Sequence, residues 1–299
     1  MHLRQLKYFI QVVEHGNLTT AASSLGLAQP TLTKSIRALE QDVGSALLRR
    51  HARGVDLTEA GERLLRHARS VVVQIDDAMQ EIQDLRDGGK ARVSIGAGPA
   101  WLRRHLPAVV ARVVAERPGL QISVSGGFDD ALLADLRIGK IDFVVSEIPG
   151  NEIPDLKVLQ LSKDDFVVFG REGHPLLGQP RTLAEISKAI WIMPPPTTRA
   201  SKRFEAHFLA RNVLPPVASI VADSMAFLLQ AIRSSDALTL SVSSTARVAD
   251  GWGLSQLVVP EIDSYREAGI IMRRNSKLSP AAQSIVDGLI DSCKIDSRS

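Results

Sequence analysis

The sequence predicts a mixed fold: a head rich in helices, one long helix, and a two-lobed α/β body. Helical periodicity with short breaks fills residues 1–58. A narrow apolar repeat runs through residues 59–88, and strand and helix patterns alternate through residues 89–299. The chain has 299 residues, more than one average domain, so several folded units are expected.

Composition limits the classes of protein that the chain can represent. It is 44% hydrophobic and 23% charged, which is ordinary for a globular protein. No run of eighteen apolar residues occurs, and the N-terminal stretch lacks the order of a secretion signal, so we expect a cytoplasmic protein with no membrane partner. The single cysteine, Cys293, excludes an intramolecular disulfide and a cysteine-rich zinc site.

Positive charge is concentrated at the front of the chain. Residues 1–58 hold seven Lys and Arg against four Asp and Glu, a net charge of +3, which equals the formal charge of the whole chain. The remaining residues are therefore formally neutral. This distribution predicts a polyanionic partner for the head alone, although a solvated basic face would give the same count.

Three helices are predicted in the head. Apolar residues at helical spacing in 3–13 predict a first helix that ends near Gly16. Asn17 or Thr19 can cap a second helix. Pro30 suits the first turn of a third helix, because the amide hydrogen that proline lacks has no intrahelical partner at that position.

The third helix has one apolar face and one polar, cationic face that carries Lys34 and Arg37. Two short helices of this kind fit a helix-turn-helix whose second helix enters the DNA major groove. An ordinary amphipathic helix with a solvated face is the alternative. The residues expected to bind DNA from these helices are Asn17, Thr19, Gln29, Pro30, Thr31, Thr33, Lys34 and Arg37.

A small β-wing is predicted after the third helix. Two short apolar stretches, 47–48 and 55–57, flank a basic turn that contains a glycine. Arg50 and Arg53 at this hairpin are placed to contact the DNA backbone or the minor groove. The wing and the third helix together favour DNA binding over the solvated-face alternative.

Residues 59–88 predict a single long helix, with Thr58 as its N-cap and Gly88–Gly89 as its end. Apolar and small residues alternate spacings of three and four, as in a coiled coil. Dimerisation is favoured over packing on the C-terminal body, and a two-fold dimer presents two recognition helices to a symmetric operator. The expected seam consists of Gly61, Leu64, Ala68, Val71, Ile75, Ala78, Ile82 and Leu85.

The body alternates strands and helices from Arg92 onward, among them a helix from Pro99 to Glu116 and a strand at 217–223, which predicts two α/β lobes joined by crossing strands. Lobe I is expected to contain about 89–163 and 266–299, and lobe II about 164–265. Ligands of such sheets bind at the carboxyl ends of the strands. The cleft candidates are Pro99, Ala100, Trp101, Phe128, Glu147, Thr197, Thr198, Arg199, Ser224 and Met225.

Helix starts and Arg199 favour an organic anion as the small-molecule effector of this cleft, with no cofactor. Taken singly, each candidate residue has a structural alternative, as a cap, a turn residue or a packing residue. No catalytic or metal-binding residue is expected, because the sequence contains neither a G-x-S-x-G elbow nor H-E-x-x-H spacing. The remaining alternatives are a cytosolic solute-binding protein, which leaves the basic head unexplained, and an α/β enzyme without a DNA role.

Residues 3–61 resemble the winged helix-turn-helix of the LysR-type bacterial transcriptional regulators in order and spacing. The motifs that carry the resemblance are Ala21–Ala22, Gln29–Pro30, Ile36–Glu40 and Arg50–Thr58. Weaker signatures extend it over nearly the whole chain. The resemblance implies a periplasmic-binding-protein-like (type 2) effector domain and dimers that pair into a homotetramer. RNA polymerase is a further candidate partner.

Overall fold

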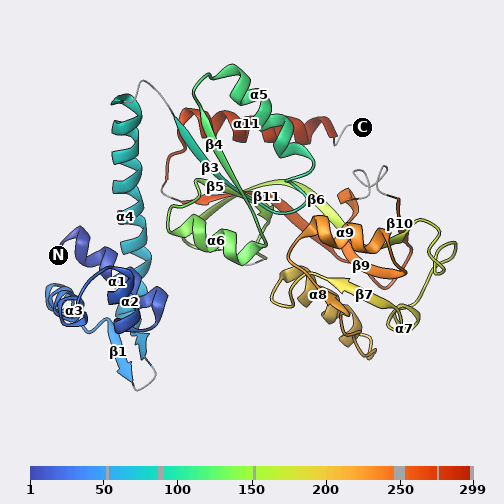
Figure 1. The fold of residues 1–299 in the computed structure, drawn as a ribbon, viewed down its shortest axis with the longest axis horizontal. Coiled ribbons are helices and arrows are strands. Elements are labelled where there is room, and N and C mark those ends of the chain that lie inside the picture. Colours follow the sequence, from blue (N-terminus) through green and yellow to red (C-terminus); the bar gives the residue numbers. More distant parts are fainter. Residues whose placement is uncertain (52–53, 87–90, 151–152, 246–252, 275, 297–299) are drawn as a thin grey trace. The chain divides into compact units, whose positions relative to one another are not determined.

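The computed structural model describes residues 1–299 except 52–53, 87–90, 151–152, 246–252, 275 and 297–299 (Figure 1). The chain forms two compact units. The head unit comprises Met1–Lys90 with Arg137–Gly139, and the body comprises Ala91–Leu136 with Lys140–Ser299. The division at Lys90 lies next to Gly88–Gly89, the predicted end of the long helix, which falls outside the described residues.

The head unit contains four helices and a hairpin in its described part. Its elements are α1 (Leu3–His15), α2 (Leu18–Ser24), α3 (Gln29–Val43), β1 (Leu48–His51), β2 (Gly54–Leu57) and α4 (Glu59–Arg86). Of the two cap candidates for α2, Asn17 is the N-cap, and its side chain accepts a hydrogen bond of 2.7 Å from the Thr19 amide. Pro30 lies in the first turn of α3, as predicted.

The core of the head forms where α3 crosses α1. Leu32, Ile36 and Leu39 of α3 are fully buried and pack with Phe9 and other apolar side chains of α1. The spacing predicts a buried face of Leu32, Ile36, Leu39 and Val43, and the first three are buried, whereas Val43, at the end of α3, is 39% exposed. Burying this face turns the opposite side of α3 toward solvent.

The wing packs on the turn between α1 and α2 through two glycines. The Val55 amide donates a 2.9 Å hydrogen bond to the Gly16 carbonyl. A Cβ atom at position 54 would collide with that same carbonyl oxygen, and Gly54 has a φ of +144°. A glycine is therefore required where the wing meets the helices.

The first part of the predicted α4 seam packs on its own head, which corrects the prediction for that part. A Cβ at Gly61 would collide with the Leu47 carbonyl, and Leu64 and Ala68 belong to the core of the head. Farther along, Val71, Ile75 and Ile82 are 41%, 36% and 52% exposed in the single chain. The exposed residues remain available to a partner, and the Leu85 side chain lies outside the described residues.

No helix in the described ranges is long and apolar enough to cross a membrane.

The body is built on one sheet with the strand order β4-β3-β5-β11-β6-β9-β7-β8, and β10 pairs with β6. Parallel pairing joins β3 to β4 and β5, and joins β7 to β8 and β9, whereas β6 and β11 are antiparallel. The strands are β3 (Arg92–Ala97), β4 (Gln121–Gly126), β5 (Phe143–Glu147), β6 (Leu156–Arg171), β7 (Ile190–Met193), β8 (Ile220–Val221), β9 (Ala237–Val242), β10 (Leu254–Leu257) and β11 (Tyr265–Arg273). The helices are α5 (His105–Glu116), α6 (Asp129–Arg137), α7 (Leu183–Ile186), α8 (Arg199–Leu209), α9 (Met225–Arg233) and α11 (Pro280–Asp296).

Two long strands join the lobes. The first part of β6, up to Asp165, pairs with β11, and its continuation from Phe166 pairs with β9. Lobe I therefore contains β3, β4, β5 and the paired parts of β11 and β6, and lobe II contains β7, β8, β9 and β10. The predicted crossing of strands between the lobes is confirmed, and it lies at residues 164–166.

Several predicted elements differ from the structure. The helix expected from Pro99 begins only at His105, because residues 99–104 form turns. The start of β6, 156–163, was not expected to be a strand, and the strand expected at 217–223 is reduced to Ile220–Val221.

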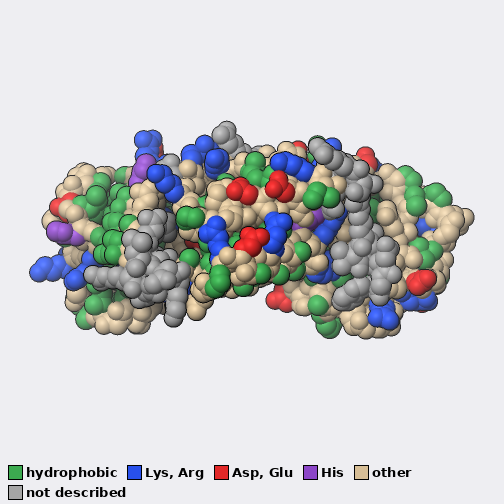
Figure 2. Space-filling model, turned by 90° about the horizontal axis from the view of Figure 1, so that it is seen from above, with side chains coloured by type: hydrophobic (Ala, Val, Ile, Leu, Met, Phe, Trp, Pro, Cys, Tyr) green, Lys and Arg blue, Asp and Glu red, His purple; other side chains and the backbone are tan. Residues whose placement is uncertain are grey.

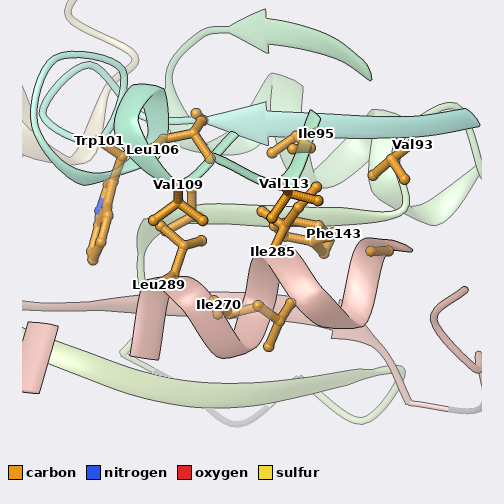
Figure 3. Packing of buried hydrophobic residues seen from close by; sticks show 14 of the residues in the cluster. Val93, Ile95, Trp101, Leu106, Val109, Val113, Phe143, Ile270, Ile285 and Leu289 are labelled. Atoms are coloured by element: carbon orange, nitrogen blue, oxygen red, sulfur yellow. The ribbon is translucent and has the colours of Figure 1, made fainter. Parts of the chain in front are cut away.

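Lobe I has its core between the sheet and two helices. Figure 3 shows Val109 and Val113 of α5 facing Leu289 and Ile285 of α11. Ile95 and Ile270, from β3 and β11, are buried in the same cluster. In Figure 2, acidic and basic side chains lie interspersed on the side of the body that carries α5 and α11, as expected for a formally neutral body.

Replacing Gly54 with alanine is expected to destabilise the head by about 3 kcal/mol or more, because a backbone collision adds to an unfavourable φ. Gly26 is the matched control: its φ is +65°, but no atom lies within 4 Å of its added Cβ. Gly26→Ala is expected to cost only about 1 kcal/mol. Hydrogen–deuterium exchange of the α1 and α3 amides measures the loss of stability in each variant. Equal losses for Gly54→Ala and Gly26→Ala would contradict the close approach of position 54 to the Gly16 carbonyl.

Candidate functional site

The solvent-facing side of α3 is the first candidate site. Its front half is polar and cationic, and the buried apolar face fixes its direction. The predicted residues on this surface that are exposed in the structure are Gln29, Pro30, Thr31, Lys34 and Arg37. Ala28, the N-cap residue of α3, has no side-chain acceptor for a capping hydrogen bond. No N-cap side chain therefore covers the amides in the first turn of α3.

The acidic residues of α3 are bound within the head. Glu40 Oε1 accepts hydrogen bonds from the amides of Leu47 and Leu48, at 2.9 and 3.2 Å. Asp42 lies 2.7 Å from the amino group of Met1, and the hydrogen bond from that group holds the pKa of Asp42 below its ordinary value. Sequence reasoning missed the role of Glu40, which ties the end of α3 to the start of the wing.

The cations on the same helix remain unpaired. Neither Lys34 nor Arg37 makes an ion pair within the described ranges, whereas Lys7 of α1 lies 2.9 Å from Asp76 of α4. Unpaired cations beside exposed hydroxyl and amide groups are suited to DNA phosphates and base edges. The polar face of α3 therefore presents two of the positive charges of the head to solvent.

Two predicted DNA residues have more restricted positions. The side chain of Asn17 is engaged as the cap of α2, while Thr19 beside it is exposed. Thr33 is half-buried, and its hydroxyl oxygen is buried without a hydrogen-bond partner in the described part of the chain. The structure therefore does not present the Thr33 hydroxyl on the α3 surface, because this position turns toward the core.

The wing adds a second cationic surface. Arg49 donates a 3.3 Å hydrogen bond to the Leu57 carbonyl across the hairpin, and His51 lies 3.4 Å from Asp56. Arg50 is exposed on β1, as predicted, and Arg53 lies outside the described residues. Such a surface can contact the DNA backbone next to the groove that α3 enters.

Two cavities lie between the lobes of the body. The smaller has a volume of about 50 Å³ and is lined by residues of both lobes, among them Arg103, Ser241 and Arg266. The larger, of about 330 Å³, is lined by residues that include Asp130, Arg199 and Asp223. Phe128 and Thr198 line both cavities, so the two adjoin.

Most of the predicted cleft residues line these cavities. The smaller one includes Pro99, Ala100 and Met225, and the larger one includes Thr197 and Arg199. Phe128 and Thr198 line both. The strand ends and helix starts that sequence reasoning selected are thus brought together by the fold.

The other three cleft candidates have structural positions. Trp101 is 3% exposed and lies at one end of the lobe I core, where its ring is 5.5 Å from that of His105 (Figure 3). Ser224 caps α9 by accepting a hydrogen bond from the Phe227 amide. Glu147 is buried and paired with Arg203. The turns at 99–104 rotate Trp101 into the core, so a ligand role for Trp101 is wrong for this arrangement.

Charged groups bridge the lobes beside the cavities. Glu147 Oε1, at the end of β5, lies 2.7 Å from Arg203 Nη2 on α8. Arg199 donates to the Glu147 carbonyl at 3.3 Å and lies 3.4 Å from Asp130 of α6. These contacts hold α8 of lobe II against lobe I.

Sequence reasoning missed Arg103 and Arg266, the charged residues that line the smaller cavity. Arg103 belongs to a stretch that was expected to be helical, so its direction could not be anticipated. Arg266 lies on β11, and the residues around it are set by the register of β11 against β6, which the sequence does not reveal. No group of three or more potential metal ligands occurs among the described residues.

A winged head whose recognition helix carries cations without an ion pair in the described ranges, joined to a two-lobed body with cavities between its lobes, is typical of a ligand-responsive DNA-binding regulator. Two family models match the chain: "Bacterial regulatory helix-turn-helix protein, lysR family" at residues 3–62 and "LysR substrate binding domain" at residues 86–294. The chain belongs to the LysR family of transcriptional regulators.

Curated relatives and a solved structure agree with this assignment. The chain is 32% identical to the HTH-type transcriptional regulator GbpR of Azospirillum brasilense over 97% of its own length and 86% of that protein. It is 30% identical to the SDS degradation transcriptional activation protein of a Pseudomonas strain, over 97% and 95%. The crystal structure of CbnR, a LysR family transcriptional regulator, has the same fold, with a TM-score of 0.58 at 23% identity, covering 98% of this chain and 99% of CbnR.

Glu147→Gln is expected to destabilise the body by about 1 to 3 kcal/mol, because the amide cannot neutralise Arg203. The Glu147 side chain is 5% exposed and that of Arg203 is 27% exposed. Water therefore reaches the arginine in part but hardly reaches the carboxylate, so it screens the ion pair weakly. All three tryptophans follow residue 90, so urea denaturation followed by tryptophan fluorescence reports on the body. Glu205→Gln, an exposed change on the same helix, is the control; equal shifts for both variants would remove the ion pair from the account.

Proposed function

We propose that the chain works as a homodimer, joined through α4, whose two heads bind an interrupted palindromic operator in the cytoplasm. A small molecule that binds between the lobes changes the relative placement of the heads. Ligand can do this only if its affinity differs between the two arrangements. In this proposal the effector is an organic anion, and the chain needs no cofactor.

One observation carries the DNA part of the proposal: the polar face of α3 is exposed and has unpaired Lys34 and Arg37, while Glu40 is bound elsewhere. A solvated basic face would not require acids to be tied back in this way. The wing with Arg50 supports the same surface.

The dimer rests on the exposed apolar residues of α4. Val71, Ile75, Met79 and Ile82 are spaced by four, four and three, so they share one helix face, and Met79 is 64% exposed. Exposed apolar residues in a row on a helix are typical of a coiled-coil partner. The homotetramer and a contact with RNA polymerase are supported by the family resemblance alone.

The alternatives explain less of the chain. A solute-binding protein or an α/β enzyme would use the body and leave the wing and the cationic face of α3 without a role. The chain catalyses no reaction in this proposal, and the lack of hydrolase and zinc-protease motifs in the sequence supports that view.

Arg37→Ala is expected to weaken operator binding by about 1 to 3 kcal/mol if Arg37 contacts a base, and to weaken binding to all sequences similarly if it contacts only phosphate. Lys7→Ala removes the same charge from the head, but Lys7 is already paired with Asp76, so little change is expected. Fluorescence anisotropy with DNA from beside the gene, at several salt concentrations, measures both the affinity and the salt slope.

Two results would refute the DNA proposal. One is a failure of the purified chain to bind any double-stranded DNA at low ionic strength, including fragments that flank its own gene. The other is an equal loss of affinity for Arg37→Ala and Lys7→Ala, since this would make α3 no more important than any other charged surface.

Ile75→Glu combined with Ile82→Glu is expected to yield monomers, because each dimer would bury four carboxylates in the α4 seam. Light scattering of the full chain measures the mass. Gln74→Glu adds charge to an exposed polar position of the same helix and should leave the dimer intact. A surviving dimer of the double variant would show that dimerisation uses another surface.

A further inference from the structure

The small cavity between the lobes contains guanidinium nitrogens that lack a partner. Arg103 and Arg266 both line it, and the Nε atom of each is buried without a hydrogen-bond partner in the described part of the chain. Arg203 lies over the ring of Phe166, which lines the same cavity, and its Nη1 atom is also buried without a hydrogen-bond partner among the described residues. Buried donors of this kind are costly, so their clustering in one place indicates that a ligand acceptor completes them.

The charge on the cavity wall is also unbalanced. Arg266 pairs across the β11–β6 ladder with Asp164, at 3.3 Å, and the two side chains are only 10% and 12% exposed. Arg103 has no acidic partner among the described residues. Burial lowers the pKa of Arg103, the direction expected for a cation that water does not fully solvate. One positive charge therefore faces the cavity without compensation.

Hydroxyl groups complete the polar wall of the small cavity. Thr198, Ser241 and Thr245 line it, but the Thr198 hydroxyl already donates to the Pro195 carbonyl at 2.8 Å. Ser241 and Thr245 share one hydrogen bond of 3.0 Å, so one hydroxyl of this pair can still donate to a ligand. Hydroxyls can donate to a carboxylate oxygen, whereas arginines supply paired donors in a fixed fork. At about 50 Å³ the cavity suits a compact polar group such as a carboxylate.

The adjoining cavity has the opposite charge balance. Asp130 and Asp223 line it together with one cation, Arg199, which already lies 3.4 Å from Asp130. The excess of carboxylates provides acceptors for ligand hydroxyls and repels a second ligand carboxylate. Its volume of about 330 Å³ suits a body of a few carbons.

We infer that the inter-lobe site binds a small hydroxy acid with a single carboxylate. Its carboxylate lies between Arg103 and Arg266, and its hydroxyl-bearing carbons extend toward Asp130 and Asp223. This inference rests on the proposed effector role of the cleft and adds the chemical class of the ligand. Arg103 and Arg266 both belong to lobe I, whereas Asp223 belongs to lobe II, so the ligand would contact both lobes.

Three six-carbon probes isolate the contribution of the carboxylate. D-Gluconate, D-glucarate and D-glucitol have the same carbon chain with one, two and no carboxylates. Glycerate and threonate extend the one-carboxylate class to shorter chains. In calorimetric titrations of the full chain without DNA, at least one hydroxy monocarboxylate is expected to bind at least tenfold more tightly than both the dicarboxylate and the polyol, and to raise the melting temperature.

Substitution at Arg103 tests the position of the carboxylate. Arg103→Gln is expected to weaken binding of the monocarboxylate at least tenfold without lowering the melting temperature of the free protein, because it removes an uncompensated charge. Arg103→Lys keeps the charge without the fork and should bind with intermediate affinity. Arg92→Gln, at the exposed start of β3, is the matched control and should bind like the wild type.

Two outcomes would overturn the inference. One is that no hydroxy monocarboxylate binds, or that the polyol or the dicarboxylate binds as tightly. The other is that Arg103→Gln and Arg103→Lys both retain wild-type affinity. DNA binding by the ligand-free chain is measured separately, so retained operator binding with a failed titration rejects only the ligand class, whereas lost operator binding rejects the proposed function.

Discussion

The body depends on one constraint, the crossing of β6 and β11 between the lobes. At this crossing Asp164 and Arg266 face each other in strand register and form an ion pair shielded from water on both sides. Phe166 lies two residues after Asp164 on β6, and its ring centroid is 4.6 Å from Cζ of the Arg203 guanidinium. Arg266 and Phe166 also line the smaller cavity, so the position of this cavity wall is set by the crossing strands.

Charge is arranged by the same rule in both units. In the head, Glu40 and Asp42 are bound to backbone amides and to the amino terminus, which leaves the cations of α3 exposed. In the body, Glu147 is bound to Arg203, while Arg103 is left without a carboxylate. The cations on the polar face of α3 and Arg103 of the body therefore have no carboxylate partner among the described residues, while nearby acids are bound elsewhere.

Elements with a regular period could be predicted from the sequence, and elements defined by pairing could not. The apolar face of α3 follows from residue spacing, and Pro30 marks the start of the helix. The spacing therefore predicts which side chains of α3 are exposed, except for Thr33, whose hydroxyl is buried, and Val43, which is exposed. The turn at 99–104 reads as helix because its apolar residues have helical spacing, and this error placed Trp101 in the cleft. Gly61 fits a heptad, but a backbone contact with Leu47 decides its position. Arg266 gives no sequence signal, because its role depends on the register of β11 against β6.

Arg103 and Arg266 both lie in lobe I, so in the proposed site a carboxylate held between them contacts one lobe. The ligand would favour one of two arrangements of the lobes through the larger cavity, which Asp130 of lobe I and Asp223 of lobe II line together. A tenfold difference in affinity between the two arrangements corresponds to about 1.4 kcal/mol, and only that difference is available to change their populations. Moving the equilibrium from 1:99 to 99:1 would need about 5.5 kcal/mol. A single carboxylate contact is therefore too weak to act alone, and the hydroxyl contacts in the larger cavity must also differ between the arrangements for the heads to respond fully.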